Sequence, residues 1–144
     1  MKDRKKKLLF VWNYLSWGGA QVYFLAIMKI ARAEWDVAVM LPRASSPEFV
    51  GYLDQLGVRH EFLELSIWEA PAPGLIDKIR RQLARLRSQR EIYRSLSRRP
   101  GIEDTIVHIE TAPWQDWIIL TLLCRKARGV YVTIDRKSTR LNSS

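Results

Sequence analysis

Hydrophobic and polar positions follow two different periods along this chain. Short, nearly continuous apolar runs indicate strands, because the strands of a parallel sheet are covered on both faces. These runs span 7–14, 35–41, 105–110 and 130–134, and a further strand is predicted at 58–65 from the alternation through Phe62, Leu63 and Leu65. Between them, apolar residues recur at helical spacing, at 20–33, 45–57, 75–97 and 113–129. We therefore predict an α/β fold: a doubly wound, mostly parallel, Rossmann-like sheet of about five strands with helices on both faces.

Several element ends carry their own signals. Ser46 stands at the N-cap and Pro47 in the first turn of the second helix, and Gly57 follows its last residue. Gly129 occupies the corresponding position after helix 113–129. Proline at the start and glycine at the end is the common arrangement in helices. We therefore expect both glycines to end their helices.

The longest predicted helix, 75–97, has two contrasting faces. We expect one face to be buried against the sheet; it comprises Ile76, Ile79, Leu83, Leu86, Tyr93 and Leu96. The other face is strongly basic and carries Lys78, Arg80, Arg81, Arg85, Arg87, Arg90 and Arg94. Three interpretations are open: solvated surface charge, which is the commonest, attachment to anionic lipid, or nucleic-acid binding without a known recognition signature.

Composition narrows the class of protein. The 144 residues suit one domain, and 47% hydrophobic with 27% charged residues is typical of a globular chain with a net charge of +9. The single cysteine, Cys124, excludes an internal disulfide and favours a reducing compartment. We expect its side chain to be a small buried apolar group. Two histidines and one cysteine, far apart in sequence, predict no metal site.

Both ends of the chain need separate interpretation. The basic start followed by an apolar run is similar to a secretory signal, but Asn13 interrupts the run and no cleavage site follows. No apolar run reaches the ~20 residues that span a bilayer, so we predict a cytoplasmic protein without a transmembrane segment. Residues 135–144, DRKSTRLNSS, look like a translated sequencing adaptor. We expect an incomplete domain at 1–134 followed by this non-native tail, with a genuine disordered tail as the alternative.

A glycine pair marks the predicted ligand site. Ligands of doubly wound sheets bind outside the carboxyl ends of the strands, where the strand order reverses, here at the loops 13–19 and 110–114. Gly18 and Gly19 permit positive φ and a close approach to the backbone, and the following helix directs unpaired N–H groups to the same place. This suits a phosphate or sugar hydroxyls; a tight turn without a ligand is the equal alternative. No dinucleotide fingerprint and no P-loop is present.

The order of these motifs resembles the start of family-4 glycosyltransferases of the GT-B fold. Gly18-Gly19-Ala20-Gln21 resembles the family's G-G-[AV]-[EQ] turn, and 36–39 resembles its second strand. Residues 49–65 are similar to its short helix and third strand. In 104–117, His108 takes the first histidine position of the fourth strand, whereas Glu110 stands where a second histidine is common. The resemblance extends over residues 6–134.

The resemblance implies a function and a set of site residues. It implies retaining transfer of a sugar from a nucleotide-sugar donor to an acceptor hydroxyl of a polysaccharide, glycolipid or cell-envelope glycan. No cofactor and no obligatory metal are implied. Gly18 and Gly19 would lie near the donor's diphosphate and sugar. The C-terminal domain with its E-x7-E motif is missing, so we expect an inactive fragment without catalytic residues. The acceptor-side candidates are Trp17, Gln21, His108, Glu110, Thr111 and Trp114.

Individual candidates keep two interpretations. His108 lies within an apolar strand, where a satisfied core histidine is commoner than a catalytic base. Glu110 and Thr111, at the end of the strand, are better placed to contact an acceptor hydroxyl. Trp17 and Trp114 flank the predicted crevice, and their rings suit either sugar stacking or simple packing.

The resemblance also bears on the basic helix. Many members of the family act on lipid-linked acceptors at the inner membrane surface, which favours peripheral contact with an anionic membrane over nucleic acid. The residues expected to face the membrane are Lys78, Arg80, Arg81, Arg85 and Arg87. Two alternatives remain: a basic Rossmann-like module that binds nucleic acid or anionic membrane without catalysis, and another nucleotide-binding α/β enzyme.

Overall fold

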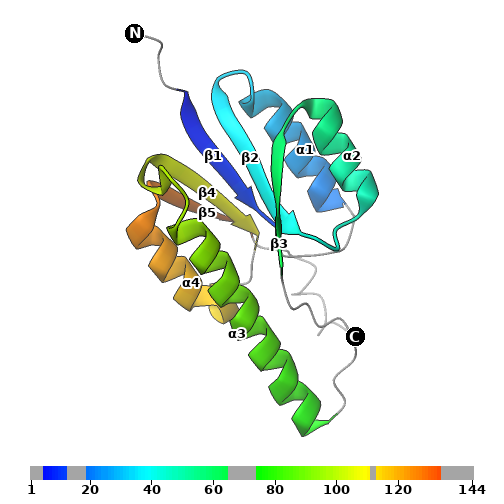
Figure 1. Cartoon of the computed structure of the whole chain (residues 1–144), viewed down its shortest axis with the longest axis vertical. Helices are drawn as coiled ribbons and strands as arrows, with labels where there is room; N and C mark the ends of the chain where they lie inside the picture. Colours follow the sequence, from blue (N-terminus) through cyan, green and yellow to red (C-terminus); the bar gives the residue numbers. More distant parts are fainter. Residues whose placement is uncertain (1–4, 13–18, 65–73, 111–112, 134–144) are drawn as a thin grey trace, which may run out of the picture.

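The computed structural model describes residues 5–12, 19–64, 74–110 and 113–133 (Figure 1). Strands and helices alternate along this part of the chain, as the two periods of the sequence predict. A short 3-10 turn, η1 (Ile102–Asp104), precedes the fourth strand. The elements are β1 (Lys6–Val11), α1 (Gly19–Ala31), β2 (Trp35–Pro42), α2 (Pro47–Leu56), β3 (Arg59–Leu63), α3 (Leu75–Ser97), β4 (Thr105–Glu110), α4 (Pro113–Lys126) and β5 (Gly129–Thr133).

The strands form one sheet in the order β3-β2-β1-β4-β5. Every pairing is parallel, and Leu9 of β1 lies opposite Ala38 of β2 and Val107 of β4. The strand order reverses between β1 and β4, where the chain crosses from one edge of the sheet back to its centre. The predicted α/β fold with a Rossmann-like parallel sheet is confirmed.

Successive side chains of each strand enter two separate cores, because they point to opposite faces of the sheet. Helices α1 and α2 cover one face, and α3 and α4 cover the other (Figure 1). Phe10 and Val39 pack with the first pair of helices, whereas Leu9 and Met40 pack with the second. The central strands are therefore apolar on both faces, as their nearly continuous apolar runs indicate.

Of the two glycines predicted to end helices, one does so and the other does not. Gly57 ends α2 in the left-handed region, with φ 65°, and the N–H groups of Gly57 and Val58 donate to the carbonyls of Asp54 and Leu53. This Schellman-type ending confirms the prediction for Gly57. The prediction for Gly129 is wrong, because α4 ends at Lys126 and Gly129 is the first residue of β5.

The N-cap residue of α2 is the predicted one, but its side chain does not cap the helix. Ser46 stands at the predicted position and Pro47 begins the helix. The Ser46 side chain, however, makes no capping hydrogen bond. The start of α2 is therefore determined by the fixed φ of proline and by packing of Phe49 and Leu53, which are buried.

The expected buried stripe of α3 is wrong over the first half of the helix. Leu96 is buried and Tyr93 partly buried, but Ile76, Ile79, Leu83 and Leu86 are exposed. The reason is length: 23 residues at about 1.5 Å each give about 35 Å, whereas strands of 5 to 8 residues at about 3.3 Å each give only about 17–26 Å. The first half of α3 therefore projects past the body (Figure 1).

Cys124 is also placed differently from the prediction. Ile119 and Leu123 of α4 are buried against the sheet, but Cys124 is exposed. One residue along a helix turns the side chain by about 100°. Cys124 therefore lies on the outer side of α4, where it is accessible to reagents.

Candidate functional site

The carboxyl edge of the sheet has the geometry of a ligand site at the reversal of strand order. The neighbouring strands β1 and β4 end side by side, with Val11 opposite Ile109. Helix α1 begins at Gly19 after β1, and α4 begins at Pro113 after β4. The two helices lie on opposite faces of the sheet (Figure 1). Their first turns carry N–H groups without helical acceptors and the positive ends of two dipoles.

The site residues predicted from the sequence lie around this edge to different extents. Trp17, Gly18 and Thr111 are outside the described residues. Gln21 lies in the first turn of α1 and Glu110 is the last residue of β4. Trp114 is the second residue of α4, and for Gln21, Glu110 and Trp114 the description stops at the backbone. Among the acceptor-side candidates, only His108 has a described side chain.

His108 packs inside a group of aromatic rings on the α1 side of the sheet. Its ring stacks on Phe10 with centroids 5.1 Å apart and meets Phe24 edge-on at 5.0 Å. Tyr131 of β5 lies 6.5 Å away. Burial lowers the pKa of His108 below its ordinary value, because desolvation disfavours the charged imidazolium. The residue is therefore a neutral, half-buried ring two positions before the carboxyl end of β4.

The lowered pKa of His108 predicts how stability depends on pH. The unfolded chain takes up this proton near the ordinary pKa of 6.5, whereas the folded chain does so only at lower pH. The unfolded state then binds more protons, so stability decreases as pH falls below 6.5. We expect His108→Phe to reduce the drop in Tm between pH 7 and pH 5. Equal drops in the variant and the wild type would contradict this assignment.

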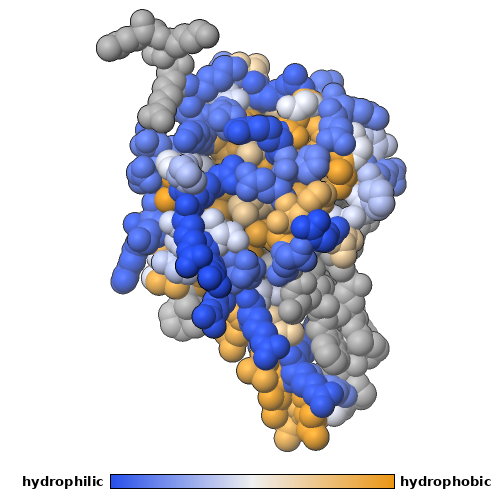
Figure 2. Space-filling model, viewed as in Figure 1, coloured by the Kyte–Doolittle hydropathy of each residue, from blue (hydrophilic) through white to orange (hydrophobic). Residues whose placement is uncertain are grey.

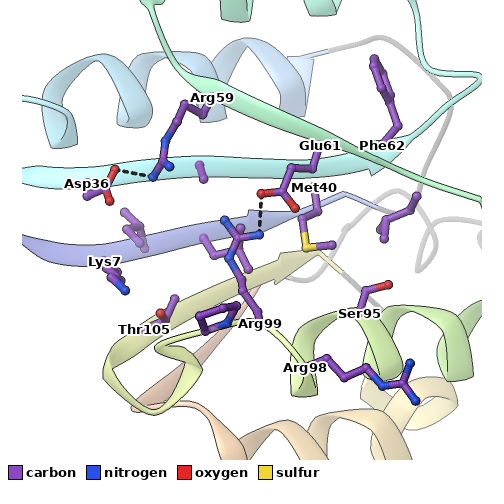
Figure 3. A pocket seen from close by; sticks show the side chains of 15 residues that line it. Lys7, Asp36, Met40, Arg59, Glu61, Phe62, Ser95, Arg98, Arg99 and Thr105 are labelled. Atoms are coloured by element: carbon purple, nitrogen blue, oxygen red, sulfur yellow. Dashed lines mark hydrogen bonds and ion pairs between the residues drawn. The ribbon is translucent and has the colours of Figure 1, made fainter.

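A second hollow, absent from the sequence expectations, lies on the α3 side of β1, β2 and β3 (Figure 3). Its volume is about 540 Å³. Leu9, Ala38, Met40 and Leu63 form an apolar floor, and all four are buried. The C-terminal end of α3 forms one wall of the hollow, because Ser95 of α3 and Arg98 and Arg99 after it line the hollow together with residues of β1, β2 and β3. The hollow is therefore a gap between the end of α3 and this face of the sheet.

Ion pairs cross the mouth of this hollow. Arg59 donates to Asp36 at 2.8 Å, and Arg99 donates to Glu61 at 2.7 Å (Figure 3). Lys7 also lines the hollow. Pairs of this exposure contribute about 0–1 kcal/mol each, so their main effect is to place charge around an apolar floor.

One sequence signal could have located this hollow. Arg59, Glu61 and Leu63 alternate along β3 and therefore share one face. Two charged residues on one face of a strand indicate that a helix does not cover that face along its full length. The alternation at 58–65 served only to predict a strand, so the hollow was not predicted.

The basic residues of α3 lie apart from both sites along the helix surface. Lys78, Arg80, Arg81 and Arg87 are exposed, and Arg85 is partly buried. Within the described ranges, no cluster of three or more His, Cys, Asp or Glu side chains could hold a metal ion. No described helix combines the length and the apolar character that crossing a membrane requires. Comparison of the sequence with known protein families and with curated proteins found no match.

Proposed function

We propose that this chain is the N-terminal, acceptor-binding half of a retaining glycosyltransferase. Its parent enzyme would move a sugar from a nucleotide-sugar donor to a hydroxyl of a polysaccharide, glycolipid or cell-envelope glycan. This half would position the acceptor and contact the donor's diphosphate, and would be inactive alone. The proposal rests on the sequence motifs together with one structural observation.

That observation is the convergence of α1 and α4 on the carboxyl edge at β1 and β4. Both first turns carry unpaired N–H groups, and each helix dipole favours a nearby anion by about 0.3–1 kcal/mol. A diphosphate that leaves during sugar transfer gains negative charge, so N–H groups at this edge would stabilise it. Gly19, the first residue of α1, and Gly18, which precedes it in the sequence, would leave room for the phosphates.

The other candidates have roles consistent with this arrangement. Glu110 is the last residue of β4 and Thr111 is the next residue of the sequence, and both would form hydrogen bonds with an acceptor hydroxyl. Trp17 and Trp114, beside the two helix starts, would stack on sugar rings. His108 would support the aromatic packing beneath the edge, because its ring is held by Phe10 and Phe24.

Titration of the full chain with pyrophosphate and with UDP-glucose, followed by NMR of the backbone amides, tests the proposal. We expect weak binding, with about millimolar Kd, that shifts the amides of Gly19 and Glu110. Gly57 and Gly101 follow α2 and precede β4, at the opposite edge of the sheet, and should not move. Shifts confined to Gly57 and Gly101 would contradict the proposal.

A matched pair of variants removes one helix-start donor. Gly19 and Leu75 are the first residues of α1 and α3, and proline is tolerated at this position. We expect Gly19→Pro to weaken pyrophosphate binding several-fold and Leu75→Pro to leave it unchanged. Equal effects of the two variants would show that the first turn of α1 is not the binding site.

The second candidate function is a basic Rossmann-like module without catalysis that binds nucleic acid or an anionic membrane. The observation that favours it is the exposed basic surface of α3, where Lys78, Arg80, Arg81 and Arg87 all face solvent. Absence of any shift with pyrophosphate or UDP-glucose, together with salt-dependent binding to DNA or to anionic vesicles, would favour this candidate over the first.

A further inference from the structure

The projecting half of α3 carries large apolar side chains that the body does not cover. These side chains are between 50% and 75% exposed. They produce the apolar surface at the free end of the helix in Figure 2. We name this set the outer stripe; it comprises Leu75, Ile76, Ile79, Leu83 and Leu86.

The outer stripe faces away from the sheet. Helical positions advance by about 100° per residue, which places all five side chains within an arc of about 100°. On the same count, the buried residues Ile92 and Leu96 lie on a different side of the helix, which packs on the sheet. The stripe is therefore no extension of the core, and the fold leaves it directed outward.

Cationic side chains border the outer stripe and continue it along the helix. Arg80 and Arg87 lie on one flank, and Arg90 and Arg94 follow the stripe toward the end of α3. The helix carries 7 basic and 2 acidic residues in all. An apolar stripe bordered by arginines is the pattern of helices that lie in the interface of a bilayer.

The positive charge of α3 also disfavours a second copy of this chain as the partner. Pairing two outer stripes would bring two strongly cationic helices together, and like charges oppose this association. Nucleic acid would be attracted by the arginines, but it offers no surface for five aliphatic side chains. An anionic bilayer satisfies both features, because its phosphates pair with arginine and its acyl chains receive the stripe.

We propose that the first half of α3 docks on the surface of an anionic membrane, with the outer stripe inserted at the boundary of headgroups and acyl chains. The helix begins after β3, at the carboxyl edge of the sheet, and projects beyond that edge (Figure 1). Docking therefore holds this edge close to the bilayer surface. The proposal does not depend on sugar transfer.

Flotation of the full chain with lipid vesicles tests the proposal. We expect binding to phosphatidylcholine vesicles with about one third phosphatidylglycerol, and much weaker binding to pure phosphatidylcholine. Ile79→Gln/Leu83→Gln should lower the partition coefficient by about tenfold. The matched control is Val22→Gln/Ile30→Gln, which alters two similarly exposed residues of α1 and should leave binding unchanged.

The single cysteine permits a second measurement that does not depend on affinity. In a Cys124→Ser background, Leu83→Cys and Ile30→Cys can each carry an environment-sensitive dye. We expect anionic vesicles to shift the emission of the dye at position 83 to the blue, and to leave the dye at position 30 unchanged.

Three results would overturn the proposal. The first is equal vesicle binding by the Ile79→Gln/Leu83→Gln variant and the wild type, with no emission shift at position 83. The second is binding to DNA without binding to vesicles. The third is a dimer in light scattering that the Ile79→Gln/Leu83→Gln variant abolishes, because the stripe would then be an interface between two copies.

Discussion

Phe24→Ala is expected to lower the free energy of unfolding by about 3–5 kcal/mol. Phe24 is 1% exposed in the core between α1 and the sheet. Its ring meets Phe10 at 5.9 Å, Trp12 at 5.2 Å and His108 at 5.0 Å, measured between ring centroids. Alanine removes the transfer free energy of the ring, and the surrounding rings cannot close the cavity that it leaves. Domains of this size are stable by about 5–15 kcal/mol, so the loss is a large part of the total.

The preceding residue provides the control for this substitution. Tyr23 belongs to the same helix but is 61% exposed, so Tyr23→Ala should change the free energy of unfolding by about 0.5 kcal/mol or less. Urea denaturation of both variants, followed by circular dichroism, measures the difference. Similar losses for Tyr23→Ala and Phe24→Ala would mean that α1 does not pack on the sheet through Phe24.

The class of fold could be predicted from the sequence because the two core faces leave a direct trace in it. Strands covered on both sides, such as β1 and β2, must be apolar at almost every position, and helices between parallel strands must be amphipathic. The order of β1 and β4 follows from the handedness of the crossover connections. These constraints act over short stretches of chain, so one sequence is enough to show them.

The residues at which helices end could be predicted only where local geometry determines them. Gly57 ends α2 through local backbone geometry, and a local signal predicted it. Gly129 carries the same signal, but the N–H of Arg128 already donates to the carbonyl of Thr105. That bond joins the chain to β4 before Gly129 is reached. A long-range hydrogen bond therefore overrode the local preference.

The candidate site was predictable in place but not in side-chain detail. The reversal of strand order between β1 and β4 locates the edge from topology alone. The role of His108 depends on which rings surround it, and Phe10, Phe24 and Tyr131 come from three different elements. The hollow beside Arg59 and Glu61 depends on how the end of α3 packs on the sheet. Neither property is encoded in a local motif.

The sequence also could not show whether the outer stripe of α3 is buried or exposed. Helical spacing of apolar residues indicates that they share a side, but it does not specify what that side faces. Ile79 and Leu83 fit a buried side as well as an outward one. Only the length of α3 relative to the sheet, and the burial of Ile92 and Leu96 on another side, distinguish the two arrangements.

Leu96→Ala and Leu83→Ala turn this distinction into a measurement. Both substitutions shorten a leucine of the same helix, but Leu96 is 0% exposed and Leu83 is 50% exposed. We expect Leu96→Ala to lower the free energy of unfolding by about 2–5 kcal/mol. Leu83→Ala should lower it by about 0.5 kcal/mol or less, because its side chain leaves no cavity and alanine favours the helix.

Urea denaturation of the two variants separates the arrangements, since a stripe packed on the sheet would make both losses large. A small loss for Leu83→Ala would also give the vesicle experiment a firm basis. An aliphatic residue that contributes little to folding, beside arginines that no core requires, is free to contribute to binding instead. A large loss for Leu83→Ala would place the stripe in the core and remove the surface on which the membrane proposal depends.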